Sequence, residues 1–131
     1  MDIADDRHCF VCGPENHEGL QAAFTVDPAN SASRCQLVIP SRYQGWQGMV
    51  HGGILATLLD ESVIYACRAQ GEKFVTAELT VRYKKPVPVE TMLVVRACVK
   101  GKKRKLLTVR SWIEAEGNVC AEADAKVFCL D

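Results

Sequence analysis

Hydrophobic and polar residues alternate through much of the second half of the chain, and this alternation predicts β-strands. Residues 74–84 form the clearest run, because nearly every second residue is apolar. Three further strands are expected over residues 92–100, 106–115 and 119–130, with short polar turns between them that suit antiparallel hairpins. In the first strand the apolar face would carry Val75, Ala77, Leu79, Val81 and Tyr83, and the polar face Thr76, Glu78, Thr80, Arg82 and Lys84.

The first half of the chain predicts two short strands and one long helix. Residues 20–26 and 34–39 read as strands separated by the loop D-P-A-N-S-A-S. Residues 53–70 follow a helical pattern that Gly71 would end. Residues 1–19 are rich in turn formers. Because neither a repeat nor a linker interrupts this order, we expect a single domain over residues 1–131.

This order of elements predicts a two-layer α+β fold, in which one helix packs on one antiparallel sheet. The helical stretch is hydrophobic on nearly all sides. Such a helix needs cover all round, so we expect the sheet to curl about it or a second subunit to cover what remains.

Charge and hydropathy narrow the partners and the compartment. The chain of 131 residues has 16 basic and 16 acidic residues, so no net field attracts nucleic acid or an anionic membrane. No apolar run reaches the roughly 20 residues that a membrane span needs. The acidic start M-D-I-A-D-D-R-H is unlike a secretory signal. We therefore expect a soluble, cytoplasmic protein.

Seven cysteines raise the questions of disulfides and of metal. Their odd number and the chain's apolar content argue against a disulfide scaffold. Cys9 and Cys12 form one C-x-x-C pair with His8 and His17 nearby, which is compatible with a metal or a redox site. A structural zinc site normally has four ligands, so we expect instead a turn-forming segment that covers the sheet, and no metal site.

Two adjacent acids in the predicted helix have different surroundings. At helical spacing, Asp60 falls on an apolar stripe, whereas Glu61 falls beside Thr57 and Arg68, as on a solvated edge. A carboxylate on an apolar stripe loses solvation and needs partners or a function. Asp60 is therefore either a buried structural residue or a catalytic one.

The start of the helix is the second candidate. Unpaired N–H groups at a helix N-terminus attract anions and developing oxyanions, and glycines let a substrate approach the backbone closely. His51-Gly52-Gly53 therefore indicates a pocket in which the N–H of Gly52 or Gly53 points at a carbonyl oxygen. The alternative is that two glycines only permit a tight turn.

Spacing relates the two candidates to each other. Gly52 and Asp60 are about 12 Å apart along a helix axis, because each residue adds about 1.5 Å. One helix cannot bring both groups to one carbonyl. Two helices that run antiparallel across a two-fold axis would bring one subunit's Asp60 to the other subunit's Gly52, so a shared site requires at least a dimer.

Three motifs in order give the chain a resemblance to a known family. These are C-F-V-C-G-P-E-N-H-E-G-L, H-G-G-I-L-A-T-L-L-D-E and L-T-V-R-Y-K-K-P-V-P-V. The chain resembles the hotdog-fold acyl-CoA thioesterases, in the branch of the phenylacetate-pathway and human thioesterase-superfamily proteins. This resemblance implies a six-stranded antiparallel sheet wrapped around one long central helix, in homodimers that often pair into homotetramers.

The resemblance also implies roles for residues. Asp60 would act as general base or nucleophile on the thioester, the Gly52 N–H would polarise the carbonyl, His51 would help to position the site, and Thr76 would support it. No cofactor is implied beyond the coenzyme A of the substrate. Some relatives carry asparagine where this chain has Gly45, and Gln47 is the candidate substitute. Because His51 and Asp60 do not reproduce the local motif of the hydratase branch, hydration of enoyl-CoA is disfavoured.

The remaining candidates concern substrate binding. Coenzyme A carries phosphates, for which Arg82, Lys84 and Lys85 are candidates, whereas the basic run of residues 102–105 reads as a solvated turn. The alternative function is a non-catalytic module that binds acyl-CoA or acyl-carrier protein. The candidates to line the substrate pocket are Trp46, Gln47, Met49, Gly53 and Tyr65.

Overall fold

The structure is a computed structural model that describes all of residues 1–131. One long helix lies between two short strands and four long ones, as the residue pattern predicts. The elements are β1 (Thr25–Asp27), β2 (Ala32–Val38), a 3-10 turn η1 (Ser41–Tyr43), α1 (Gly52–Cys67), a second 3-10 turn η2 (Arg68–Gln70), β3 (Phe74–Tyr83), β4 (Met92–Lys103), β5 (Leu106–Ala115) and β6 (Asn118–Cys129).

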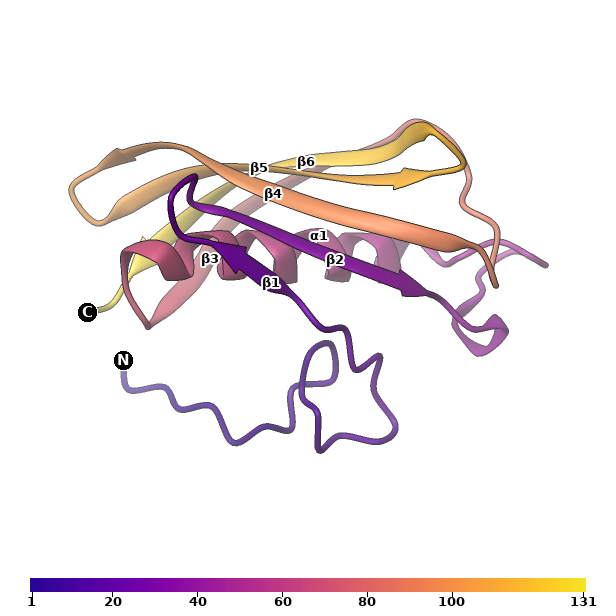
Figure 1. Cartoon of the computed structure of the whole chain (residues 1–131), viewed down its shortest axis with the longest axis horizontal. Coiled ribbons are helices and arrows are strands. Elements are labelled where there is room, and N and C mark those ends of the chain that lie inside the picture. Colours follow the sequence, from indigo (N-terminus) through magenta and orange to yellow (C-terminus); the bar gives the residue numbers. More distant parts are fainter.

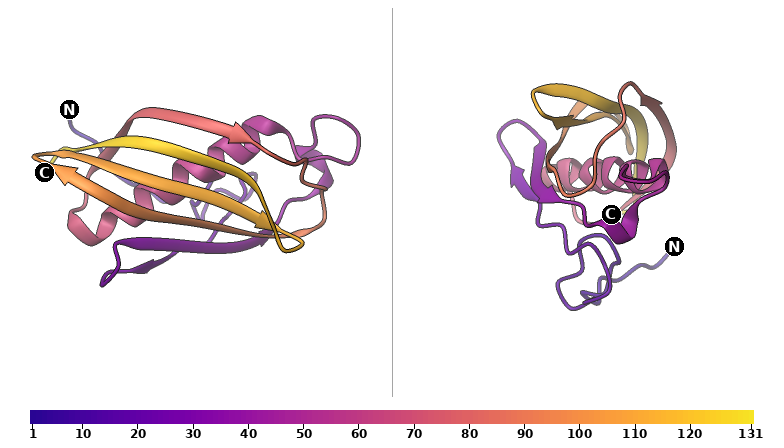
Figure 2. Two further views of the ribbon diagram at one scale, coloured as in Figure 1. Left: turned by 90° about the horizontal axis from the view of Figure 1, so that it is seen from above. Right: turned by 90° about the vertical axis from the view of Figure 1, so that its right-hand side faces the viewer.

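All six strands join one antiparallel sheet in the order β1-β2-β4-β5-β6-β3. The sheet curves over α1, which contacts every strand (Figures 1 and 2). The expected hotdog arrangement, a six-stranded antiparallel sheet wrapped around one central helix, is confirmed. Strand β3 is one edge of this sheet and is paired on one side only, with β6.

Helix α1 holds the core together through the face that it turns to the sheet. Its fully buried residues include Leu58, Leu59 and Val63, which pack against side chains from the inner face of the strands. Each such side chain contributes about 2 kcal/mol of hydrophobic stabilisation. No helix of the chain has the length and apolar character needed to cross a bilayer.

Strand β3 departs from the simple alternation expected of it. Its register with β6 slips between Thr76 and Glu78, so Ala77 is an extra residue in a β-bulge. Residues after the bulge keep the expected faces, with Leu79 and Val81 turned to the core. Before the bulge the faces are exchanged. Thr76 therefore points inward toward α1, and its assignment to the outward polar face is wrong.

The N-terminal segment, residues 1–19, lies against α1 on the side away from the sheet (Figure 1). The N–H groups of Leu20 and Ala22 donate to the carbonyl oxygens of Phe10 and Val11 in this segment. These N–H groups are therefore not available to a longer first strand. For this reason β1 is only three residues long and begins at Thr25, later than the expected start at residue 20. The segment covers the helix rather than the sheet.

Candidate active site

Asp60 lies at the middle of α1, half-buried, on the side of the helix that faces β3. The Thr76 hydroxyl donates a 2.6 Å hydrogen bond to Asp60 Oδ1. No other group of the chain donates to this carboxylate, so Oδ2 has no partner within the chain. A carboxylate that is held by one oxygen and free at the other can accept a proton from a water molecule or attack a carbonyl.

The first turn of α1 leaves one glycine N–H without an acceptor. His51 is the N-cap residue, and its Nδ1 accepts a 2.8 Å hydrogen bond from the Gly53 N–H. Because Nδ1 is the acceptor, the proton of the neutral ring lies on Nε2. The Gly52 N–H donates to nothing in the chain. Of the two glycines, Gly52 is thus the one that can donate to an incoming oxyanion.

Tyr83 holds this first turn from the end of β3. Its hydroxyl donates a 2.9 Å hydrogen bond to the Gly52 carbonyl oxygen, and its ring lies against the Gly52 α-carbon, where an added Cβ would sit 3.4 Å from the ring. The alternation of residues 74–84 predicts only an apolar strand face for Tyr83. Its role follows from the place where β3 ends, which is beside the start of α1. The spacing of residues along the chain does not show that these two ends meet.

An open hollow of about 530 Å³ adjoins the helix start. Gly45, Trp46 and His51 line it together with Gly52. The Trp46 side chain is 89% exposed, and Gln47 and Met49 are also exposed on the same loop. A large exposed apolar side chain in this position is available to a ligand or to another protein surface. Gly45 lies so close to His51 that an added Cβ would be 3.2 Å from the ring.

The three basic candidates on β3 and the residues after it divide between two places. Lys84 and Lys85 line a hollow of about 260 Å³ together with Gly52 and Tyr83, beside the start of α1. The Lys85 ammonium donates to the Asn118 side chain at 3.0 Å and has no acidic partner. Arg82 lies on the outer face of the sheet, ion-paired with Glu122 at 3.0 Å and Asp124 at 2.8 Å, and the Lys84 ammonium also reaches Glu122, at 3.3 Å.

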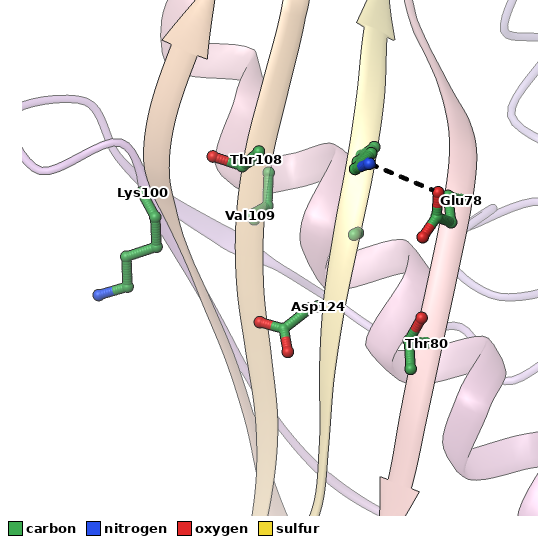
Figure 3. Close-up of a pocket in the computed structure, with 8 residues that line it drawn as sticks. Glu78, Thr80, Lys100, Thr108, Val109 and Asp124 are labelled. Atoms are coloured by element: carbon green, nitrogen blue, oxygen red, sulfur yellow. Dashed lines mark ion pairs between the residues drawn. The ribbon is translucent and has the colours of Figure 1, made fainter.

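The outer face of the sheet carries charged residues from neighbouring strands. Figure 3 shows a shallow hollow there, with Glu78 and Thr80 from β3, Lys100 from β4 and Asp124 from β6. The helix, with Asp60 and the glycines, lies on the opposite side of the sheet. Nearby, Glu122 contacts three cations, and Arg82, the strongest of these partners, helps to hold the Glu122 carboxyl pKa down at about 2.

Glu61 does not lie on a solvated edge, and that interpretation is wrong. Its carboxylate is half-buried beneath the N-terminal segment, with the Cys9 sulfur 3.8 Å from Oε1. The ring of Tyr65, one turn further along, stacks on Phe24 with 4.9 Å between centroids. Tyr65 therefore packs between the helix and the segment that precedes β1, away from the hollow beside Trp46 and His51.

Within one chain, the two halves of the candidate site stay apart. Gly52 opens α1 and Asp60 is its ninth residue, so about 12 Å of helix separates them. Thr76 contacts Asp60, whereas His51, Gly53 and Tyr83 lie around Gly52. Each half has its own supporting residue from β3, which places both halves along the same free edge of the sheet.

Comparison with known proteins adds family information to this geometry. Residues 47–122, which include the helix and most of the long strands, match the family model described as the thioesterase superfamily. Acyl-coenzyme A thioesterase THEM4 of Rattus norvegicus is 29% identical over 93% of this chain, which corresponds to 54% of that protein. The chain thus spans about half the length of this curated relative, and a smaller share, 38%, of human THEM5.

Solved structures share the same fold. The thioesterase superfamily protein RHA08564 superposes with a TM-score of 0.85 at 29% identity, over 94% of this chain and 63% of that one. The PaaI protein of the phenylacetic acid degradation operon of E. coli superposes with a TM-score of 0.73 at 19% identity, over 78% of this chain and 75% of that one. At such identity the second comparison concerns the fold alone.

Proposed function

Because this chain belongs to the thioesterase superfamily, we propose that it hydrolyses an acyl-CoA thioester to a free acid and coenzyme A. The observation that carries the proposal is that one helix presents two groups without a partner in the chain. These are the Gly52 N–H at its start and one carboxylate oxygen of Asp60 at its middle. The thioesterase relatives point to the same reaction, although they are longer proteins.

The proposed chemistry needs no metal and no organic cofactor. The thioester carbonyl oxygen accepts the Gly52 N–H, and the positive end of the α1 dipole adds to its polarisation. Asp60 then takes a proton from a water molecule whose oxygen attacks the carbonyl carbon. The carbon–sulfur bond breaks, the electron pair leaves with the thiolate, and the thiolate takes up a proton. In the alternative route Asp60 attacks directly, and water then hydrolyses the resulting anhydride.

The working unit in this proposal is a homodimer. A two-fold axis beside β3 would pair the free edges of two β3 strands and set two α1 helices antiparallel, with Asp60 of each facing Gly52 of the other. Strand β3 supports this arrangement, because ten residues of unpaired edge are an open template for another strand. The half-buried Ala56, Asp60 and Ile64 lie on one stripe of α1 and would gain cover. Two dimers would then pair as a tetramer.

Coenzyme A is the proposed carrier because Lys84 and Lys85 lie beside the Gly52 end of the site. Lys85 has no acidic partner, so its charge is available to a phosphate group. Arg82, which Glu122 and Asp124 neutralise on the outer face, contributes less. Trp46 lines the open hollow, and Gln47 and Met49 are exposed on the same loop; all three are proposed to contact the acyl group. Gly53 lines an adjoining hollow on the other side of His51 and is proposed to take part in substrate binding there.

The direct test measures thiol release from short, long and aryl acyl-CoA thioesters. We expect turnover of at least one class, and a fall in kcat of roughly 10²–10⁴-fold for Asp60→Asn, as for loss of a general base or nucleophile. A wild-type chain that binds acyl-CoA without releasing thiol would instead be a binding module of the same fold. That result would overturn the enzymatic proposal.

Subunit complementation tests the shared site. Gly52→Pro removes the N–H at the first helical position, where proline is tolerated, and the extended His51 (ψ 134°) suits a residue before proline. Mixed with Asp60→Asn chains through unfolding and refolding, it forms heterodimers with one intact site. Activity should recover to about a quarter of the wild-type value from two inactive parents. Gly52→Ala, which keeps the N–H, is the matched control. No recovery would exclude a shared site.

A further inference from the structure

The N-terminal segment brings two thiols to a carboxylate on α1, at a place that the thioesterase proposal does not use. Cys9 Sγ lies 3.8 Å from Glu61 Oε1 and 3.9 Å from Oε2. One ligand atom each from Cys9, Cys12 and Glu61 lie within 4.8 Å of one another, and all three side chains are half-buried. The N-terminal segment that carries both cysteines lies beneath α1 (Figure 1).

The backbone of the C-x-x-C turn is shaped to hold its first sulfur. The Val11 N–H donates to Cys9 Sγ at 3.4 Å, and the Gly13 N–H donates to the Cys9 carbonyl oxygen at 2.8 Å. At residue 13 an added Cβ would lie 2.4 Å from the Cys9 nitrogen, so only glycine fits after the second cysteine. The turn thereby fixes the position of the Cys9 sulfur beside α1.

The carboxylate at this place has no cation of its own. Glu61 forms no ion pair in the chain, and the nearest basic residue along the helix, Arg68, stacks on the Tyr65 ring at 4.1 Å. A half-buried carboxylate facing two thiols is costly unless a positive charge joins them.

We propose that Cys9, Cys12 and Glu61 bind one zinc ion, with a water molecule in the fourth position. Thiolate ligands select zinc over magnesium and calcium. Around a tetrahedral zinc, a sulfur and a carboxylate oxygen lie roughly 3.6 Å apart. The Cys9 sulfur and Glu61 Oε1, at 3.8 Å, are already close to this spacing, and the three ligand atoms lie within 4.8 Å of one another. Binding releases the two thiol protons to solvent, and the two thiolates and the carboxylate then surround the divalent ion.

Such an ion would fasten residues 1–19 to α1 at the residue next to Asp60, but on the other side of the helix. The site needs Glu61 as well as the cysteines, and Glu61 is 49 residues from Cys12 in sequence. The expectation of no metal site rested on a single C-x-x-C and did not include this third ligand. The site is independent of the proposed hydrolase activity, since neither Asp60 nor Gly52 takes part.

Metal analysis of the full chain, purified without chelators, is the first test. We expect about one zinc ion per wild-type chain, and loss of this zinc in Cys12→Ser and in Glu61→Gln. Cys98→Ser, at a half-buried cysteine on β4, is the matched control and should keep its zinc. Circular dichroism establishes that each variant is folded. Folded wild-type protein that takes up no zinc, or that carries a Cys9–Cys12 disulfide by mass spectrometry, would overturn the proposal.

Cobalt provides a readout of the ligands themselves. Co²⁺ added to metal-free wild-type chain should produce the intense thiolate-to-metal absorption of a tetrahedral site, saturating at about one equivalent. The band should be lost in both Cys9→Ser and Glu61→Gln, in line with their expected loss of zinc. A band that is identical in Glu61→Gln would remove the carboxylate from the site and contradict the proposed ligand set.

Discussion

Thr76 donates a 2.6 Å hydrogen bond to Asp60, joining the edge strand to the middle of the central helix. This bond occupies one carboxylate oxygen and leaves the other free, so it fixes the direction in which Asp60 can act. In the proposed mechanism Thr76 is therefore a positioning residue. It does not need to touch the substrate.

Substitutions at Thr76 distinguish the positioning of Asp60 by the hydroxyl from the packing of the side chain. Thr76→Val keeps the shape of the side chain but loses the bond to a charged acceptor, and we expect kcat to fall roughly tenfold with KM little changed. Thr76→Ser keeps the hydroxyl and should retain most of the activity. Steady-state thiol release measures both. Equal kcat values for the valine variant and wild type would show that Asp60 needs no such support.

Tyr83→Phe removes the hydrogen bond to the Gly52 carbonyl and keeps the ring against the glycine. Loss of about 1 kcal/mol of stability is expected in urea unfolding. Because the Gly52 peptide then turns more freely, kcat should fall as well, roughly fivefold. If stability falls while kcat is unchanged, the tyrosine serves the fold alone.

His51 provides a test of the helix cap. Its Nδ1 accepts the Gly53 N–H, so His51→Ala leaves that donor free and should cost about 1 kcal/mol of stability. Asparagine is a good N-cap, and His51→Asn should restore the stability. Comparing kcat in the two variants shows whether the ring does more than cap the helix. Full activity in His51→Asn would limit the histidine to capping.

Lys85 tests the proposed contact with coenzyme A. Lys85→Ala should raise KM for acyl-CoA about fivefold, as for loss of about 1 kcal/mol of attraction to phosphate. KM for the matching acyl-pantetheine, which lacks the phosphates, should not change. An equal rise for both substrates would mean that the lysine supports the site without contacting phosphate. Arg82→Gln is the comparison variant, and a smaller effect is expected because Arg82 is already ion-paired.

The ion pairs of Glu122 predict that the folded state loses stability in acid. Arg82 above all, with Lys84 and Arg110, lowers its carboxyl pKa from 4.5 to about 2. A carboxyl whose pKa is lower in the folded state stabilises the fold fully above pH 4.5, and this contribution is lost as the pH falls toward 2. Chemical unfolding from pH 6 to about pH 2.5 should show a shallower decline for Glu122→Gln than for wild type. Parallel curves would contradict this assignment.

The order of elements and the separation of Asp60 from Gly52 follow from the sequence, because each depends on local spacing. Residues 106–115 form the expected strand without adjustment. The orientation of Thr76 could not be predicted, since a bulge adds one residue and exchanges the faces before it. Alternation alone carries no sign of such an insertion.

Contacts between distant parts of the chain escape sequence analysis for a different reason. Tyr83 and Gly52 are 31 residues apart, and Glu61 is 52 residues from Cys9. These pairs meet only because the sheet curves round the helix and the N-terminal segment crosses beneath it. A residue pattern with a period of two or of about 3.6 residues describes one element and does not show which elements touch.

The bulge at Ala77 also sets where β3 tolerates a change in length. Thr76 opposes Val127 and Glu78 opposes Lys126, so these two pairs are already neighbours on β6. Deletion of Ala77 would join them in a regular ladder and would turn no side chain over. Deletion of any other interior residue of β3 would send its neighbours on one side to the wrong face. Position 77 is thus the place where a homologous strand one residue shorter can still present a hydroxyl to the helix.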